Sequence, residues 1–464
     1  MRHLAVSSFF LIALGVACSP ASPTGPTGGS GGSATGGTTG SGGQNGAGSG
    51  GSSSGGSSSG GASSGGSSSG GASSGGASSG GRNGSGGVGT GGGATGGSSS
   101  GGNGSGGSAS GGTGGGGDGG AAAPSFVFAS GNASTIRVYR LDPATGMLQA
   151  LSMTSDGGQS PTYLALHPNK KFLYALNEAG SSSKIIAFSV GTDGALAKLA
   201  TNGEATTAPG QGPPHLSVHP SGKWIFAAHY GSGHTTVHPI TSNGGVGALV
   251  FNDKTCASEA HQAKVDPTGK FLLVPCRTPN TVAQYKIDEA TGMLTANNPA
   301  RVTAPTAGTG PRHMDFHPNG KWAYVLGELN GHVLTYAYDG ATGLLSNPME
   351  IPTKDGENAA AHIVVHPTGK FAFVSLRKSN EITTLTLDAT TGQPTVTAHQ
   401  TTMISTPRDF TLDPSGRFLL VANQNSGNVV VFGVDQTAGT LTMRSAMATA
   451  GISNPQCVVA ATLP

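Results

Sequence analysis

Six stretches of the chain share one pattern of apolar and polar positions: a short apolar strand, a polar turn and a second apolar strand. They read LALHPNKKFLYALNE, LSVHPSGKWIFAAHY, AKVDPTGKFLLVPCR, MDFHPNGKWAYVLGE, IVVHPTGKFAFVSLR and FTLDPSGRFLLVANQ. Their prolines stand at positions 168, 220, 267, 318, 367 and 414, so the unit repeats roughly every 50 residues. Pro with a following Gly is typical of a tight turn. Lys170 replaces that Gly in the first copy, and we expect its turn to differ slightly.

A second signature, in the forms DPATGML, DEATGML, DGATGLL and DATTGQP, joins two further strands between these stretches. Four strands per unit without a helical pattern predict an all-β fold, a β-propeller. FVFAS, from Phe126, resembles a second strand without a first, and the C-terminal SNPQCVVAATLP resembles a first strand without a second. We therefore predict a seven-bladed β-propeller closed by N- and C-terminal strands that share one blade, which removes free sheet edges.

The hairpin register gathers polar residues at one mouth of the predicted channel. In GPRHMDFHPNGKWAYVLGEL, Arg312 begins the first strand and Glu328 follows the second, so both lie on the face opposite the turn. The candidate catalytic residues in this register are His261, Arg312, Glu328 and Arg377. The candidate substrate-binding residues are His215, His229, Arg277, His313, His362 and Arg408. The alternative is a polar lining that only bonds neighbouring strands and water. His167, His219, His317 and His366 precede the turn prolines, and we expect them to be structural.

Composition divides the chain into two parts. Residues 19–122 are almost entirely Gly, Ser, Thr, Ala and Asn, which cannot bury enough apolar surface to fold, so we expect a disordered Gly/Ser-rich linker. Residues 123–464 have the composition of a globular domain and carry the propeller repeats. The net charge of +2 argues against a nucleic-acid partner. We expect a monomer that binds a small anionic substrate or ligand.

Residues 1–18 have the pattern of an export signal, with Arg2 and His3 before an apolar run that is short for a membrane span. GVAC resembles the bacterial lipoprotein box, which implies lipidation of Cys18 and a membrane contact through the lipid anchor only. The predicted location is a membrane-anchored lipoprotein in the periplasm or on the cell surface; simple secretion and an uncleaved anchor are the alternatives. Cys256 and Cys276 flank one hairpin and could pair in an oxidising compartment.

Three stretches of the globular part resemble the seven-bladed lactonase family, which includes propeller-type 6-phosphogluconolactonases and 3-carboxymuconate cyclase. They are SPTYLALHPNKKFLYALNE, GPRHMDFHPNGKWAYVLGEL and TPRDFTLDPSGRFLLVANQNSGNVVVF. The resemblance covers Ser125 to the C-terminus and implies that Arg312 and Glu328 belong to the site, together with His261 in SEAHQAKVDP and Arg377 in VSLRKSN. The chain departs from the family where SE replaces the usual PH before His261, and where Leu rather than Asn precedes Arg377.

The resemblance implies a lactonase, a carboxylic-ester hydrolase that needs no cofactor and no metal. Glu328 or His261 would act as general base on water, while Arg312 and Arg377 would hold a carboxylate or phosphate. The predicted export argues against 6-phosphogluconolactone, a cytosolic metabolite, and favours an anionic lactone outside the cytoplasm. Two alternatives stay open: a propeller that binds a ligand without catalysis, and a protein-interaction scaffold on the cell surface.

Overall fold

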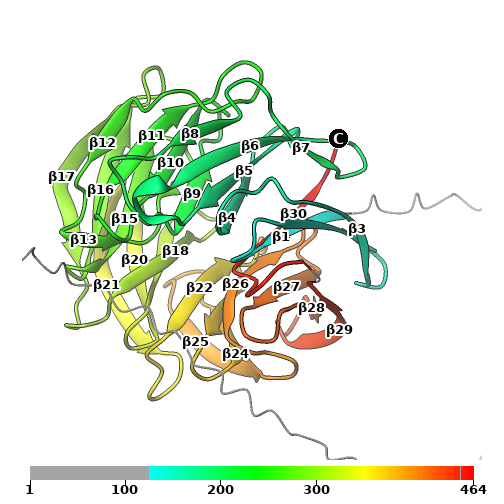
Figure 1. Cartoon of the computed structure of the whole chain (residues 1–464). Coiled ribbons are helices and arrows are strands. Elements are labelled where there is room, and N and C mark those ends of the chain that lie inside the picture. The colour runs from blue at the N-terminus through cyan, green and yellow to red at the C-terminus, as the bar shows by residue number, and fades with distance from the viewer. Residues whose placement is uncertain (1–124, 450) are drawn as a thin grey trace, which may run out of the picture. The chain divides into compact units, whose positions relative to one another are not determined.

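The computed structural model describes residues 125–449 and 451–464, which form seven antiparallel sheets arranged in a ring (Figure 1). The predicted signal, Cys18 and the predicted linker lie outside the described residues. Blade 1 contains β1 (Ser125–Ser130), β2 (Ile136–Leu141), β3 (Leu148–Thr154) and β30 (Cys457–Thr462). Blade 2 contains β4 (Pro161–Leu166), β5 (Phe172–Asn177), β6 (Lys184–Val190), β7 (Leu196–Lys198) and β8 (Glu204–Thr206). A 3-10 turn, η1 (Gly180–Ser182), joins β5 to β6.

The remaining blades follow in chain order. Blade 3 contains β9 (His215–Val218), β10 (Trp224–Ala228), β11 (Thr235–Pro239) and β12 (Phe251–Asp253). Blade 4 contains β13 (Ser258–Ala260), β14 (Lys264–Val265), β15 (Phe271–Thr278), β16 (Thr281–Ile287) and β17 (Leu294–Thr303). Blade 5 contains β18 (Pro311–Phe316), β19 (Trp322–Gly327), β20 (His332–Asp339) and β21 (Leu344–Pro352). Blade 6 contains β22 (Ala360–Val365), β23 (Phe371–Leu376), β24 (Glu381–Leu387) and β25 (Pro394–Gln400). Blade 7 contains β26 (Pro407–Leu412), β27 (Phe418–Asn423), β28 (Asn428–Val434) and β29 (Leu441–Ala448).

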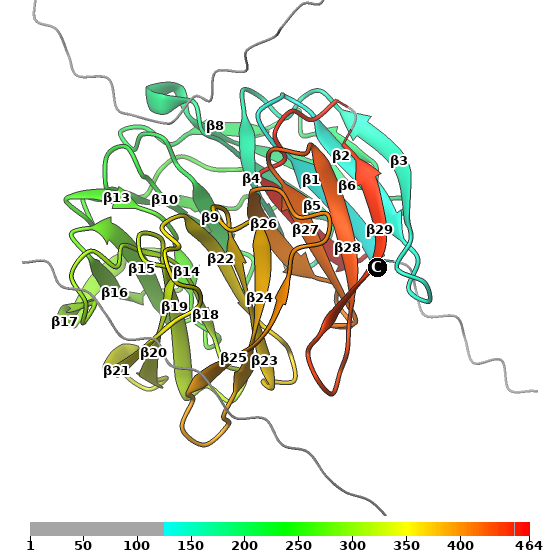
Figure 2. The ribbon, with the colours of Figure 1, turned by 90° about the horizontal axis from the view of Figure 1, so that it is seen from below.

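The two ends of the propeller sequence share blade 1, as the sequence predicted. β30 pairs antiparallel with β1, from Ser125 opposite Thr462 to Ser130 opposite Cys457, and forms the innermost strand of that sheet. The outer strands β3 and β29 of blades 1 and 7 lie side by side (Figure 2). The seven-bladed prediction is therefore confirmed, and the ring has no free inner edge where the chain starts and ends.

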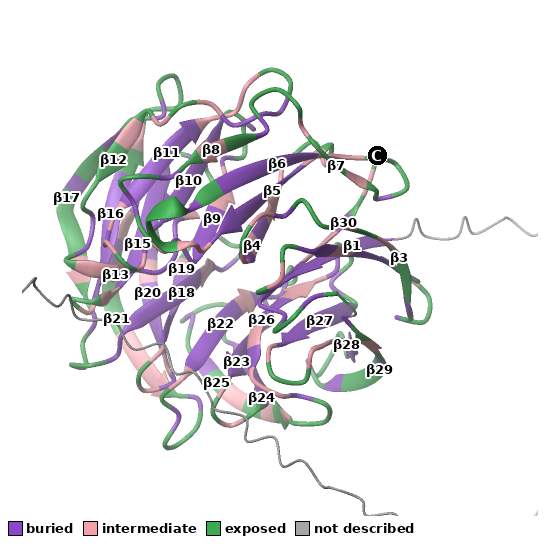
Figure 3. Ribbon diagram, in the orientation of Figure 1, coloured by how far each residue is buried: buried purple, intermediate pink, exposed green. Residues whose placement is uncertain are grey.

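The apolar core lies between neighbouring blades. Alternate residues of β19 show how one strand serves two interfaces: Ala323 and Val325 pack against blade 4, whereas Tyr324 and Leu326 pack against blade 6. This follows from the two-residue period of a strand, whose successive side chains point to opposite faces of the sheet. The blades are buried along their inner strands and exposed in the outer strands and turns (Figure 3). Among the described residues, no helix has the length and apolar character needed to cross a bilayer.

Histidines before the turn prolines connect each blade to the next. The Nε2–H of His317 donates to the carbonyl oxygen of Gly369 at 2.9 Å. The same bond recurs from His167 to Gly222, from His219 to Gly269 and from His366 to Gly416. These histidines are thus structural, as expected. We expected the turn at Lys170 to differ from the others, and this was wrong. The φ of Lys170 is 62°, close to the 69–75° of the equivalent glycines, so Lys170 adopts the same left-handed conformation.

Candidate active site

Four of the sequence-predicted residues meet at the mouth where the inner strands begin. Arg312 lies on β18, Glu328 directly follows β19, Arg277 lies on β15 and Arg377 directly follows β23. These elements belong to blades 4, 5 and 6, so the cluster is built from three neighbouring sheets. We call Arg277, Arg312, Arg377 and Glu328 the arginine cluster.

The carboxylate of Glu328 is the centre of this cluster. Its Oε2 lies 2.8 Å from Arg277 Nε, its Oε1 contacts Arg377 Nη2, and Arg312 Nε is 3.8 Å from the same Oε1. The Glu328 side chain is 13% exposed and that of Arg312 is 3% exposed, so these charges interact with little solvent screening. Two backbone carbonyls complete the arrangement: Ala361 accepts from Arg312 Nη1, and Ala359 accepts from Arg377 Nε.

Three guanidinium groups decide the protonation of Glu328. Burial raises the pKa of this carboxyl, but the charges of Arg312, Arg377 and Arg277 lower it further, and the net pKa lies below the ordinary value. Glu328 is therefore a fixed anion at neutral pH. A carboxylate held in this way orients the arginines well and accepts a proton poorly.

A second carboxylate, which the sequence reasoning missed, extends the cluster. Glu259 on β13 pairs with Arg277 Nη1 at 2.8 Å and accepts hydrogen bonds from Tyr230 at 3.0 Å and Thr278 at 2.7 Å. The backbone of Glu259 has a φ of 59°, a left-handed conformation that is uncommon for Glu and that no local sequence motif predicts. The positive φ and the partners on neighbouring strands are tertiary features, so the only sequence signal was the place of Glu259 two residues before His261.

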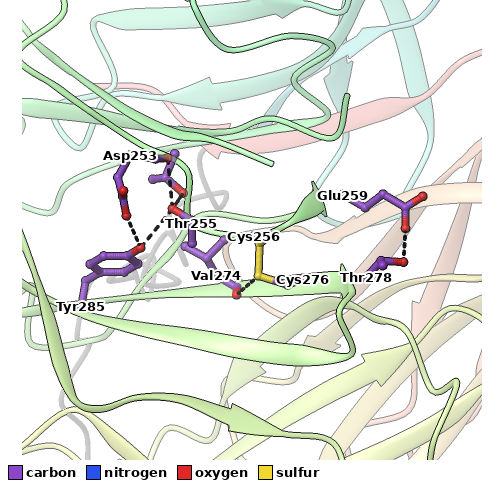
Figure 4. Close-up of a disulfide and its surroundings, with 9 residues drawn as sticks. Asp253, Thr255, Cys256, Glu259, Val274, Cys276, Thr278 and Tyr285 are labelled. Atoms are coloured by element: carbon purple, nitrogen blue, oxygen red, sulfur yellow. Dashed lines mark hydrogen bonds between the residues drawn. A yellow bond between two sulfur atoms is a disulfide. The ribbon is translucent and has the colours of Figure 1, made fainter. Parts of the chain in front are cut away.

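A disulfide fixes the segment that carries Glu259. Cys256 and Cys276 are bonded, which confirms the pairing left open by the sequence (Figure 4). Cys276 lies on β15, one residue before Arg277, and pairs with Ala260 of β13. The disulfide therefore links the two segments that carry the Arg277–Glu259 ion pair.

Four buried histidines lie beside the arginine cluster. His215, His261, His313 and His362 are each at most 9% exposed. The ring of His313 is central: its centroid lies 4.8 Å from that of His362, 5.1 Å from His261 and 5.5 Å from His215. We call these four residues the histidine cluster.

The histidine cluster is neutral near pH 7. Burial lowers the pKa of His261 and His313 well below the ordinary value, and the nearby charge of Arg312 lowers both further. The same two causes lower the pKa of His362 to about 3. Among the described residues, His261 Nδ1 and His313 Nε2 are buried and have no hydrogen-bond partner. Neutral rings with unpartnered nitrogens can accept a proton from a bound reactant.

The last two candidates have different positions. Arg408 lines a small channel pocket together with Arg312, His313 and Asp409. His229 is not part of the histidine cluster: its Nε2 bonds Thr236 Oγ1 at 2.9 Å inside blade 3, and its ring packs against Gly210. The expectation that His229 lines the mouth is thus wrong, because adjacent residues point to opposite sides of an extended chain and Tyr230 takes the position facing Arg277.

Comparison with known proteins places the propeller in one family. The family model described as "Lactonase, 7-bladed beta-propeller" matches residues 126–460. The chain belongs to this lactonase family. A 6-phosphogluconolactonase of Pectobacterium carotovorum is 33% identical over 218 residues, which are 47% of this chain and 62% of that protein. A 6-phosphogluconolactonase of Yersinia pestis is 34% identical over 208 residues, or 45% of this chain and 59% of that protein.

The chain thus spans about 60% of the length of these curated relatives. Two solved structures are similar over nearly their whole length. A putative 6-phosphogluconolactonase from Bacteroides fragilis has a TM-score of 0.67 and 25% identity, and covers 74% of this chain and 99% of its own. The periplasmic gluconolactonase of Pseudomonas aeruginosa has a TM-score of 0.66 and 25% identity, and covers 74% and 100%. Proteins with both names therefore share this fold.

Proposed function

We propose that this protein is a lactonase that opens an anionic lactone ring by hydrolysis outside the cytoplasm. The observation that carries the proposal is the arginine cluster: three guanidinium groups around Glu328, next to neutral histidines with unpartnered nitrogens. Cations at the mouth attract and orient an anionic ligand, while neutral imidazoles beside them can activate water.

The electrostatics favour particular roles in this reaction. Glu328 holds the arginines in place, and both of its carboxylate oxygens face guanidinium groups. We assign the base to a histidine of the cluster, either His261 or His313, because each has a buried ring nitrogen without a hydrogen-bond partner among the described residues. Arg312 precedes His313 in the chain and lines the same pocket, so it would stabilise the oxyanion that forms on the lactone carbonyl. Arg377 would bind a carboxylate or phosphate of the substrate, as planar guanidinium groups do well.

The substrate class follows from the charges and the relatives. The curated relatives are named for 6-phosphogluconolactone, and one structural neighbour is named a periplasmic gluconolactonase. Both names refer to lactones of sugar acids. The arginine cluster favours such a lactone with an anionic substituent over an uncharged one.

The location is proposed from the N-terminal sequence and from that periplasmic neighbour. Cys18 would carry the lipid, and residues 19–122 would hold the propeller away from the membrane. Metabolic labelling with a fatty acid should label the wild type, whereas a Cys18→Ser variant should remain unlabelled. Equal labelling of both proteins would contradict the lipoprotein proposal and leave secretion as the alternative.

A lactone panel tests the activity. The full chain would be assayed by acid release against glucono-1,5-lactone, 6-phosphoglucono-1,5-lactone and a carboxylated lactone, with spontaneous hydrolysis as the blank. We expect turnover above the blank, with a higher kcat/KM for an anionic lactone than for the uncharged one. Binding of the hydroxy acid or lactone without turnover would instead support the non-catalytic propeller.

A further inference from the structure

Three buried side chains from three blades form a line across the channel. Asp409 on β26 faces His362 on β22, with Asp409 Oδ1 3.6 Å from His362 Nε2. His362 Nδ1 in turn lies 2.5 Å from Nδ1 of His313 on β18. Asp409, His362 and His313 are 5%, 9% and 3% exposed. The line ends at His313 Nε2, which has no partner among the described residues and belongs to a residue that lines the channel pocket.

The close contact between the two Nδ1 atoms has a consequence for the protons. Both rings are neutral, so one Nδ1 must carry the hydrogen and the other must accept it. Asp409 determines which of the two Nδ1 atoms carries the hydrogen. Its Oδ2 accepts the backbone N–H of Val458 at 3.0 Å, and its Oδ1 faces His362 Nε2. An ionised Asp409 has only acceptors, so it favours the hydrogen of His362 on Nε2.

The remaining tautomers follow from that choice. With its hydrogen on Nε2, His362 presents a lone pair at Nδ1 and accepts the Nδ1–H of His313. His313 then has no hydrogen on Nε2, and this buried nitrogen carries a free lone pair. A protonated Asp409 would reverse every step and would leave Nε2 of His313 as a donor.

We propose that Asp409 and His362 set the tautomer of His313, and that His313 Nε2 is the general base of the lactonase. This inference rests on the proposed function for its chemical step. It gives His362, which the sequence predicted to bind substrate, a positioning role, and it adds Asp409 as a second positioning residue. His313 is the catalytic residue of the three, since Asp409 and His362 act through it.

In the hydrolysis step, His313 Nε2 removes one proton from water while the water oxygen bonds to the lactone carbonyl carbon, which gives an anionic tetrahedral intermediate beside Arg312. The intermediate re-forms its carbonyl as the bond to the ring oxygen breaks. The departing oxygen takes the proton from His313 Nε2, and the product is the open-chain hydroxy acid. The His313 ring returns to its starting tautomer, because its Nδ1–H stays on His313 and keeps its hydrogen bond to His362 Nδ1.

We expect the pH dependence of the rate to follow the ionisation of Asp409. Burial raises the pKa of Asp409 to about 6. The charged and titratable groups around the line are Arg312, Arg408, Lys264, Tyr163, Cys457, His215 and His261. Of these, Arg312 favours the ionised form of Asp409, whereas the thiol of Cys457 and the phenol of Tyr163 are neutral because burial raises the pKa of both. We therefore expect the rate to rise with pH through about 6, and we assign this rise to Asp409.

Asp409→Asn tests the relay. The amide oxygen can keep the bond from Val458, and the amide nitrogen then faces His362 Nε2 as a donor, which imposes the reverse tautomers. We expect kcat to fall by a factor on the order of 100 or more. Asp315→Asn is the matched control, because Asp315 Oδ2 accepts the N–H of Val365 from the next blade at 2.8 Å in the same way. The control should lose less than about 3-fold, and equal losses would overturn the proposal.

A spectroscopic readout separates the relay from the proposed activity. In protein labelled with ¹⁵N-histidine and assigned through His313→Gln, the His313 signal at pH 7.5 should report hydrogen on Nδ1 in the wild type and on Nε2 in Asp409→Asn. Hydrogen on Nε2 in the wild type, or no change in the variant, would overturn the relay. A wild type with the expected tautomers and no lactone turnover would support the relay and overturn the proposed function and the role of His313 as its base.

Discussion

Arg312 and Glu328 leave the same hairpin at the same mouth, yet the nearest cations to Glu328 come from the neighbouring blades. Arg312 Nε is 3.8 Å from Glu328 Oε1, whereas Arg277 Nε is 2.8 Å from Oε2 and Arg377 Nη2 contacts Oε1. Glu328 therefore joins blades 4, 5 and 6 electrostatically. We therefore expect Glu328 to contribute both to stability and to the candidate site.

Glu328→Gln should lower both stability and turnover. The amide leaves three guanidinium groups without their shared anion, and breaking a buried ion pair costs about 3–5 kcal/mol when burial is full. We expect a loss toward the lower end of that range, measured by chemical denaturation, and a fall in kcat/KM. Glu289→Gln is the control, because Glu289 and its partner Lys223 are both more than half exposed and such pairs contribute roughly 0–1 kcal/mol. Unchanged stability in Glu328→Gln would contradict the central position of this carboxylate.

The same pair of proteins gives a pH prediction. The folded pKa of Glu328 lies below its ordinary value of 4.5, so its stabilisation is complete above that pH and is lost as pH falls through the folded pKa. The difference in unfolding free energy between the wild type and Glu328→Gln should therefore be largest near pH 7 and smaller at about pH 3. A difference that stays constant over this range would mean that the arginines do not lower the pKa of Glu328.

Arg377→Lys should weaken the binding of anionic lactones. Arg377 uses Nε for the Ala359 carbonyl at 2.8 Å and Nη2 for Glu328, and a lysine ammonium cannot keep this fork. We expect KM for an anionic lactone to rise by roughly 10-fold or more, with a smaller change for glucono-1,5-lactone. Arg417→Lys on the opposite turn face provides the control. An equal KM change for both lactones would argue against an anion-binding role.

Removing the disulfide should destabilise blade 4. Cys256 and Cys276 are 20 residues apart, and closing a loop of this size stabilises a protein by about 3 kcal/mol. The Cys256→Ser, Cys276→Ser double variant should therefore have a lower Tm than the wild type under oxidising conditions. Reductant should lower the wild-type Tm and leave that of the variant unchanged. A wild-type Tm that does not respond to full reduction would show that the bond contributes no stability.

Deleting the chain after Thr449 should prevent a stable ring. The deletion removes β30, whose Cys457, Val458 and Ala461 are at most 1% exposed, and leaves β1 with an open inner edge. We expect the truncated protein to aggregate or to show no cooperative unfolding transition in calorimetry. Deletion of Pro464 alone should have little effect, because this residue is exposed and follows β30. A truncated protein that stays monomeric and equally stable would contradict the shared blade.

The sequence by itself determined the architecture. The repeated turn at Pro and Gly, the strand alternation and the unmatched strands at the two ends specify blade number and closure, because each is a local property of the chain. The same register placed Arg312, Glu328 and Arg377 at one mouth, since hairpin geometry fixes which face a strand end reaches.

Only the tertiary structure decided which side chains meet. Contacts across blades depend on how neighbouring sheets twist and pack. Sheet packing pairs Arg277 with Glu328 and with Glu259 at the mouth. It also buries His229 inside blade 3. The line from Asp409 through His362 to His313 spans three blades and 96 residues of sequence, so no local pattern could indicate it. Burial then set the pKa values that distinguish the fixed anion Glu328 from the neutral histidines, because the cost of charging a group depends on the solvent that the fold removes.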